Sequence, residues 1–159
     1  MSPNNDVAQF KDYQFVTPPV MIDADLELKL AGTDPYDLLK GWVPAYRFAM
    51  VHAASKVIMG NIDLRVGLTE KLRMMGGHIG YEVYEPYRGH RYATRACRLL
   101  LPFARTLGIN PVLLTCDPAN IPSVKTIEAL GGELLRTHQV ELEPGAFRWT
   151  NVYQISFAQ

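Results

Sequence analysis

Apolar and polar residues alternate with a period of two in several short segments, which is the pattern of strands that bury one face. The clearest example is the segment 25–31, where leucines alternate with charged residues. A continuous apolar run at 112–116 is typical of a buried strand. A turn at 143–146 predicts a hairpin near the C-terminus. The expected strands are 25–31, 45–52, 57–66, 80–84, 112–116, 133–142 and 147–157.

Helical patterns separate some of these strands. Apolar residues recur at helical spacing in the segment 91–107, which predicts a long helix. A short helix is expected to run from Asp34, a good N-cap followed by proline, to Gly41. Another short helix is expected at 124–130, where two glycines end it. The segment 68–77 combines charged residues, methionines and two glycines, and we expect a mobile connector there.

The order of these elements, β-α-β-β-β-α-β-α-β-β, predicts an α/β protein with a mixed sheet flanked by helices. The chain length suffices for one domain spanning residues 1–159, with the first ten residues flexible. Sixteen basic and sixteen acidic residues cancel, so we expect no general attraction to nucleic acid or membranes. With two cysteines and no secretory signal, we expect a reduced, cytoplasmic protein.

A basic turn connects the strand 80–84 to the long helix. It contains Arg88, His90 and Arg91 around Gly89. The free backbone N–H groups and the dipole at a helix N-terminus favour negative charge, so strand, turn and helix together predict an anion-binding site. Without a second signal, the same turn is equally well explained as a solvated loop.

Two spaced motifs and the order of the elements resemble the GCN5-related N-acetyltransferase (GNAT) superfamily. Its members carry Arg/Gln-x-x-Gly-x-Gly/Ala between strand and helix, which Arg88, Arg91 and Ala93 match, except that arginine replaces the first glycine. Asn120 and Ser123 match a second motif, Asn-x-x-Ser/Ala, although helix capping also explains this pair. The resemblance implies the GNAT fold, a mostly antiparallel central sheet of about seven strands that splays between its fourth and fifth strands.

The same resemblance implies acetyl-CoA as co-substrate and no metal ion. In the family, the turn holds the cofactor's pyrophosphate, and the preceding strand binds the pantetheine amides through its backbone. The second motif contacts the pantetheine arm. The cofactor-binding residues expected in this chain are Tyr81, Val83, Arg88, Gly89, His90, Arg91, Tyr92, Ala93, Asn120 and Ser123. Arg91 is expected to add a charge-assisted contact to a phosphate.

Acetyl transfer to an amine needs a base, because a free alkyl amine is protonated at neutral pH. Glu82 and His78 share one face of their strand and are the candidate catalytic residues. Structural alternatives stay open for both, namely a carboxylate at the rim of the site and a hydrogen-bonded structural histidine. Many family members place a tyrosine that acts as general acid seven residues after the motif asparagine. This chain has Ile127 there, so no acid is assigned.

The resemblance implies an N-acetyltransferase that moves an acetyl group directly to a primary amine of a small molecule or peptide. The alternative is a non-catalytic acyl-CoA-binding sensor or partner-binding module. We expect the acceptor pocket to form from residues 42–48, 68–75 and 147–153, with Arg65 available to orient an anionic group. Neither nucleic acid nor a membrane is expected as a partner, and homodimer formation stays open.

Overall fold

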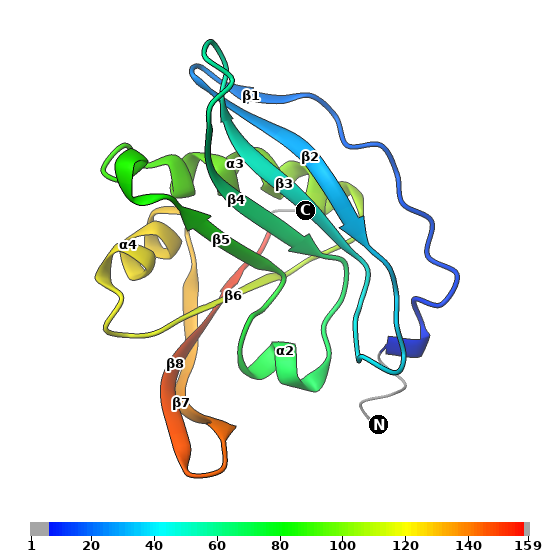
Figure 1. Cartoon of the computed structure of the whole chain (residues 1–159). Coiled ribbons are helices and arrows are strands. Elements are labelled where there is room, and N and C mark those ends of the chain that lie inside the picture. Colours follow the sequence, from blue (N-terminus) through cyan, green and yellow to red (C-terminus); the bar gives the residue numbers. More distant parts are fainter. Residues whose placement is uncertain (1–6, 158–159) are drawn as a thin grey trace.

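The computed structural model describes residues 7–157, and its strands form two separate antiparallel sheets (Figure 1). In the larger sheet, β1 to β5 lie side by side in chain order. In the smaller sheet the order is β6-β8-β7, so the C-terminal hairpin pairs with β6 through its second strand. The bounds are β1 Met21–Asp23, β2 Leu26–Asp34, β3 Ala45–His52, β4 Ile58–Arg65, β5 Ile79–Val83, β6 Val112–Cys116, β7 Glu133–Glu143 and β8 Ala146–Ile155.

The longest helix, α3, packs against one face of the larger sheet and lies behind it in Figure 1. Its buried side chains Ala96, Leu100 and Phe103 recur three or four residues apart, as the sequence pattern predicts. No described helix covers the opposite face of the sheet. The remaining bounds are α2 Glu70–Met74, a 3-10 turn η1 Glu85–Tyr87, α3 Tyr92–Thr106 and α4 Ile121–Ala129.

The two faces of the larger sheet differ in polarity because side chains alternate along each strand. On β4, Ile62 and Leu64 are fully buried in the hydrophobic core that also contains the buried residues of α3. Asn61, Asp63 and Arg65 alternate with them and are only partly buried. The face that α3 leaves uncovered therefore carries a polar stripe along β4.

The two sheets meet at one end of β5 and diverge from there. The backbone N–H of His78 donates to the carbonyl of Leu113 at 2.8 Å, just before β5 begins. Beyond this point β5 pairs with β4 alone within the described residues, and β6 pairs with β8. This divergence confirms the predicted fold class. The splay lies between β5 and β6, which correspond to the fourth and fifth strands expected from the sequence. The short strand β1, which the sequence pattern missed, brings the strands to eight among residues 7–157.

The prediction of a short helix from Asp34 to Gly41 is wrong. β2 continues to Asp34, which pairs with Ala45 of β3, and a tight turn follows in which Asp37 and Trp42 form a β-bridge. The Asp34 carboxylate accepts from Arg47 Nε at 3.2 Å instead of capping a helix. Strand pairing thus overrides the local helix signal.

Two other segments are more helical than expected. The connector 68–77 contains α2, which Thr69 caps by accepting from the N–H of Leu72 at 3.1 Å. The helix expected at 124–130 begins at Ile121, because Asn120 caps it. Proline at its second position needs no hydrogen-bond donor there.

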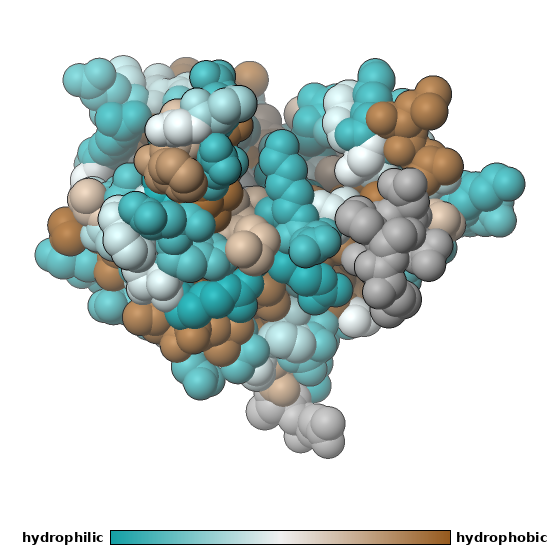
Figure 2. Space-filling model, turned by 90° about the horizontal axis from the view of Figure 1, so that it is seen from below, coloured by the Kyte–Doolittle hydropathy of each residue, from teal (hydrophilic) through white to brown (hydrophobic). Residues whose placement is uncertain are grey.

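Residues 1–6 of the segment expected to be flexible lie outside the described residues. Directly after them, Val7 is buried and Phe10 packs against the core. From below, the surface is mostly hydrophilic, with apolar side chains in separate patches (Figure 2). Among residues 7–157 there is no helix of the length and apolarity needed to cross a bilayer.

Candidate functional site

A cleft of about 860 Å³ opens where the two sheets diverge. One wall is β5 with the turn that follows it, and the other is α4. The first turn of α3 lies between them. Nine of the ten expected cofactor-binding residues line this cleft, and His90 is the exception.

The N-terminus of α3 faces the cleft without a side-chain cap. The first backbone bond within the helix runs from the N–H of Arg95 to the carbonyl of Arg91 at 3.0 Å. The N–H groups of Tyr92, Ala93 and Thr94 precede it and have no backbone or side-chain acceptor in the described part of the chain. All three residues line the cleft. Unsatisfied donors and the helix dipole make this a favourable place for an anion.

The turn before α3 requires unusual backbone angles. Gly89 has φ 90°, and Arg91, at the N-cap, has φ 60° and ψ 26°. The left-handed region is costly for residues with a Cβ. This cost explains why the Arg/Gln-x-x-Gly-x-Gly/Ala motif has glycine at the position of Arg91. Arg88 fixes the other end of the turn by donating from Nε to the carbonyl of Val83 at 2.9 Å.

The cleft is cationic. Arg88, Arg91, Arg98 and Lys125 line it, and Glu82 is the only carboxylate among the described lining residues. The expected residues did not include Arg98 or Lys125. Arg98 lies seven positions after Arg91, two helical turns along the same side of α3, so helical spacing could have identified it.

A hydrogen bond of 2.7 Å between the hydroxyls of Tyr81 and Ser123 joins the two walls of the cleft. Burial raises the pKa of Tyr81 to about 12, so this phenol stays protonated at neutral pH. Asn120 accepts from the N–H of Ser123 at 3.3 Å and therefore caps α4, as one of the two explanations of the motif requires. Ile127 is fully buried and supplies no acid to the cleft.

His78 lies outside the cleft lining and fastens β5 to β6. Its side chain is 7% exposed, and Nδ1 accepts from the N–H of Leu113 at 2.9 Å. Burial, together with the nearby Arg73 and Arg65, lowers the pKa of His78 to about 4. The imidazole is therefore neutral at pH 7 with one nitrogen already used, which favours the structural alternative for this residue.

Glu82 is exposed and lines the cleft. The pairing of β4 with β5 sets Asn61 opposite Glu82 and Asp63 opposite Gly80. Both carboxylates thus lie on the face that α3 leaves uncovered, Asp63 across from Gly80 on β4 and Glu82 two residues along β5. Burial raises the pKa of Asp63. The expected catalytic residues did not include Asp63, although its alternation with Arg65 on one strand is visible in the sequence.

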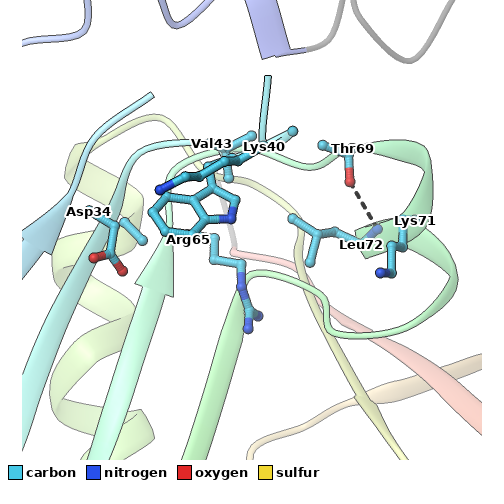
Figure 3. A pocket seen from close by; sticks show the side chains of 10 residues that line it. Asp34, Lys40, Val43, Arg65, Thr69, Lys71 and Leu72 are labelled. Carbon is cyan, nitrogen blue, oxygen red and sulfur yellow. Dashed lines mark hydrogen bonds between the residues drawn. The ribbon is translucent and has the colours of Figure 1, made fainter. Parts of the chain in front are cut away.

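A second cavity of about 330 Å³ lies on the same uncovered face, near α2. Figure 3 shows Arg65 between Asp34 on one side and the α2 residues Lys71 and Leu72 on the other. Two of the three segments expected to form an acceptor pocket contribute to it, through residues 42–45 and 69–72. The third, 147–153, lies on β8 and does not line it.

Comparison with known families assigns the chain. The model of the acetyltransferase (GNAT) domain matches residues 4–133. The chain belongs to the GNAT acetyltransferase family. It is thus an enzyme of the N-acetyltransferase class, as the resemblance implied. No curated protein gives a significant match.

Solved structures of GNAT proteins share the fold. The RimL ribosomal L7/L12 alpha-N-protein acetyltransferase with coenzyme A is 14% identical, with a TM-score of 0.65, covering 87% of this chain and 98% of that one. The microcin C7 self-immunity acetyltransferase MccE with acetyl-CoA and AMP is 19% identical, with a TM-score of 0.57 and coverages of 71% and 61%. A GNAT acetyltransferase from Bacillus anthracis is 17% identical, with a TM-score of 0.56 and coverages of 69% and 65%. At these identities the likeness concerns the fold.

Within residues 7–157, no cluster of three or more His, Cys, Asp or Glu side chains is placed to hold a metal ion. The two cysteines are free; Cys97 is buried and Cys116 is partly buried. Burial raises the pKa of both thiols.

Proposed function

We propose that this GNAT enzyme transfers the acetyl group of acetyl-CoA directly to a primary amine of a small molecule or peptide. The observation that carries this proposal is the uncapped N-terminus of α3 inside the cationic cleft. Two structures of the same fold, RimL and MccE, contain coenzyme A or acetyl-CoA.

The residues present fit this cofactor. The N–H groups of Tyr92, Ala93 and Thr94, with Arg88 and Arg91 beside them, suit the pyrophosphate. Arg98 and Lys125 add two further cations to the lining, which suits the additional phosphate of coenzyme A. Along the splay, β5 offers an edge that no described strand pairs. Its free backbone groups suit the pantetheine amides, with Asn120 and Ser123 on the opposite wall.

Acetyl-CoA supplies an activated acyl group. The C–N bond to the acceptor amine forms and the C–S bond of the thioester breaks, so coenzyme A leaves as its thiolate. The amine loses a proton in the same reaction. We assign the removal of that proton to Glu82, which is exposed and lines the cleft. We assign the polarisation of the acyl oxygen to backbone N–H groups on the free edge of β5. His78 has a hydrogen-bonded, buried imidazole and holds the two sheets together instead.

The test is incubation of the protein with acetyl-CoA and a panel of amines, amino acids and peptides. Release of free thiol and a gain of one acetyl mass on the acceptor are measured together, with acetyl-CoA alone as the hydrolysis control. Transfer to at least one primary amine is expected. Tight binding of acetyl-CoA without transfer to any member would favour the sensor alternative. The cytoplasmic location, the absence of nucleic-acid and membrane partners, and the oligomeric state stay predictions.

A further inference from the structure

Arg65 is a half-buried cation that forms no salt bridge with a described carboxylate, although Asp63 lies near enough to attract its charge. Its Nη1 donates to the carbonyls of Gly76 and Gly77 at 3.2 and 3.0 Å. Burial lowers the pKa of this guanidinium, which reflects the cost of removing its charge from water. Buried cations are normally held in direct ion pairs, and Arg65 is not, so its N–H groups that bond no carbonyl are suited to an anionic ligand.

The cavity that Arg65 lines combines positive charge with apolar walls. Lys40, Arg65 and Lys71 oppose a single described carboxylate in the lining, Asp34, and that carboxylate already accepts from Arg47. The Nζ of Lys40 lies 4.4 Å from the ring centroid of Trp42. Val43 and Leu72 add apolar surface. The cavity therefore suits an anion attached to an apolar or aromatic group.

The same guanidinium reaches β5, where the acyl group is proposed to lie. A Cβ built on Gly80 would lie 3.6 Å from Nη2 of Arg65, and the other described atom within 4 Å is Nη1 at 3.9 Å. Asp63 is opposite Gly80 on β4, and Glu82 is two residues further along β5. A group placed near Gly80 is thus next to one guanidinium, with Asp63 across on β4 and Glu82 two residues along β5, an arrangement that suits an ammonium and a carboxylate held side by side.

We propose that the acceptor is a small amino carboxylic acid with an apolar or aromatic side chain, bound with its carboxylate on Arg65 and Lys71. The inference rests on the proposed function, because it names the substrate class of the same site. It disfavours the N-terminus of a protein, whose amine is followed by a neutral amide, and it disfavours polyamines, which carry no carboxylate. The amine then lies beside Gly80, on the face of the sheet that carries Asp63 and Glu82.

The experiment compares matched acceptors that differ in the carboxylate. Phenylalanine, leucine and methionine are assayed with acetyl-CoA against phenylalaninamide, 2-phenylethylamine and a short peptide with N-terminal phenylalanine. The free acids are expected to have kcat/KM at least about tenfold above the amide, the usual effect of a charge-assisted hydrogen bond. Equal or better use of the amide, the amine or the peptide would overturn the inference and leave the proposed function intact.

Variants locate the effect. Arg65→Gln is expected to lower kcat/KM for free acids at least about tenfold more than it lowers kcat/KM for phenylalaninamide, and a thermal unfolding curve checks that the variant is folded. Lys71 is exposed, so Lys71→Gln is expected to lower kcat/KM for free acids by only about threefold. Arg73→Gln, on the same helix but outside the cavity lining, is the matched control and leaves kcat/KM unchanged. An equal loss for acid and amide in Arg65→Gln would contradict the proposed role.

A binding measurement separates this inference from the proposed function. N-acetylphenylalanine is titrated into the coenzyme A-loaded protein by calorimetry. If no acceptor turns over but this ligand binds, and Arg65→Gln weakens its binding by about tenfold, the carboxylate site stands and the catalytic proposal fails. If the ligand does not bind, the amino carboxylic acid inference fails whatever the outcome of the turnover assay.

Discussion

The cleft and the cavity beside it are assembled in opposite ways. All the described lining residues of the cleft come from two continuous segments, 81–98 and 120–129, and its anion site is made of backbone N–H groups. The cavity takes residues from four places in the chain: the end of β2, the turn at 40–45, Arg65 on β4 and α2. Its character comes from side chains, namely three cations, one carboxylate and an aromatic ring.

This difference follows from what each site has to recognise. A pyrophosphate is the same in every acyl-CoA, and a helix N-terminus with a suitable turn is sufficient to bind it. An acceptor varies from one enzyme to the next, and its recognition depends on side chains that the fold brings together. Variants in the cleft should therefore change acetyl-CoA affinity alone, whereas variants in the cavity should change the acceptor KM alone. Glu82 lies at the border of the two.

The largest expected effect is that of Glu82→Gln. Removal of a general base lowers kcat by about 100-fold or more. Acetyl-CoA affinity should stay within about twofold, because the neutral isostere keeps the shape of the side chain. Initial rates at saturating acceptor, together with cofactor titration, give both quantities. Glu85→Gln, in the neighbouring turn η1, is the control.

Asp63→Asn tests which of the two carboxylates near Gly80 acts as the general base. We expect it to raise the acceptor KM more than it lowers kcat, since Asp63 is assigned to holding the ammonium group. If Asp63→Asn abolishes kcat while Glu82→Gln retains it, Asp63 is the base and the assignment of Glu82 is wrong.

The next largest effect concerns His78, which fastens the two sheets where the cleft begins. Its pKa is about 4 in the folded chain against an ordinary 6.5, so the unfolded chain binds the proton more readily between these values. Stability from this group is therefore complete above pH 6.5 and is lost as pH falls toward 4, by about 3 kcal/mol in total. Denaturant unfolding between pH 7 and pH 4 measures it.

His78→Asn removes the titrating group and keeps an acceptor for the N–H of Leu113. The His78→Asn variant should be less stable than the wild-type protein at pH 7. Its unfolding free energy should nevertheless fall less steeply as the pH is lowered. His138→Asn, which affects a partly buried histidine bonded to the carbonyl of Met74, is the matched control. An unchanged acid slope in His78→Asn would show that other groups cause the pH dependence.

Sequence patterns reveal most of the cleft because its elements are local. β3 and β6 have the bounds that alternation and the apolar run predict, and α3 begins one residue after its predicted start. The basic turn and the Asn120 cap are contiguous with these elements. The positive φ of Arg91 is not readable from one sequence, because arginine by itself gives no signal for the left-handed region.

The cavity could not be predicted to the same extent. The segment after Asp34 has helix signals, and the register of β2 against β3, set by side chains far along the chain, turns it into a strand end and a tight turn. The short helix α2 depends on a single Thr69 cap in a segment that looks like a loop. Arg65 and the segments 42–48 and 68–75 are readable from the sequence as parts of an acceptor pocket, whereas Asp34 and Lys40, which also line the cavity, are not.

A smaller effect is expected from substitution of Arg91, and it concerns acetyl-CoA binding in the cleft alone. Arg91→Asn tolerates the left-handed conformation but removes the charge, and it should weaken acetyl-CoA binding by about threefold to tenfold. The acceptor KM should not move. Calorimetry with acetyl-CoA measures the affinity, and Arg148→Gln on β8 controls for net charge. Tighter binding by Arg91→Gly would show that the Cβ at this position hinders the phosphates and that the side chain adds no contact.

The smallest effect is expected from Tyr92→Phe. The Tyr92 hydroxyl donates to Asp25, and Arg95 donates to Asp23 and Asp25, so the start of α3 is tied to the turn between β1 and β2. Phenylalanine keeps the packing of the ring and loses this hydrogen bond, so the unfolding free energy should fall by about 1 kcal/mol. Acetyl-CoA affinity should fall by less than about threefold, because the backbone N–H groups stay in place. A large loss of affinity with unchanged stability would instead mean that the hydroxyl contacts the cofactor directly and releases Asp25 when it binds.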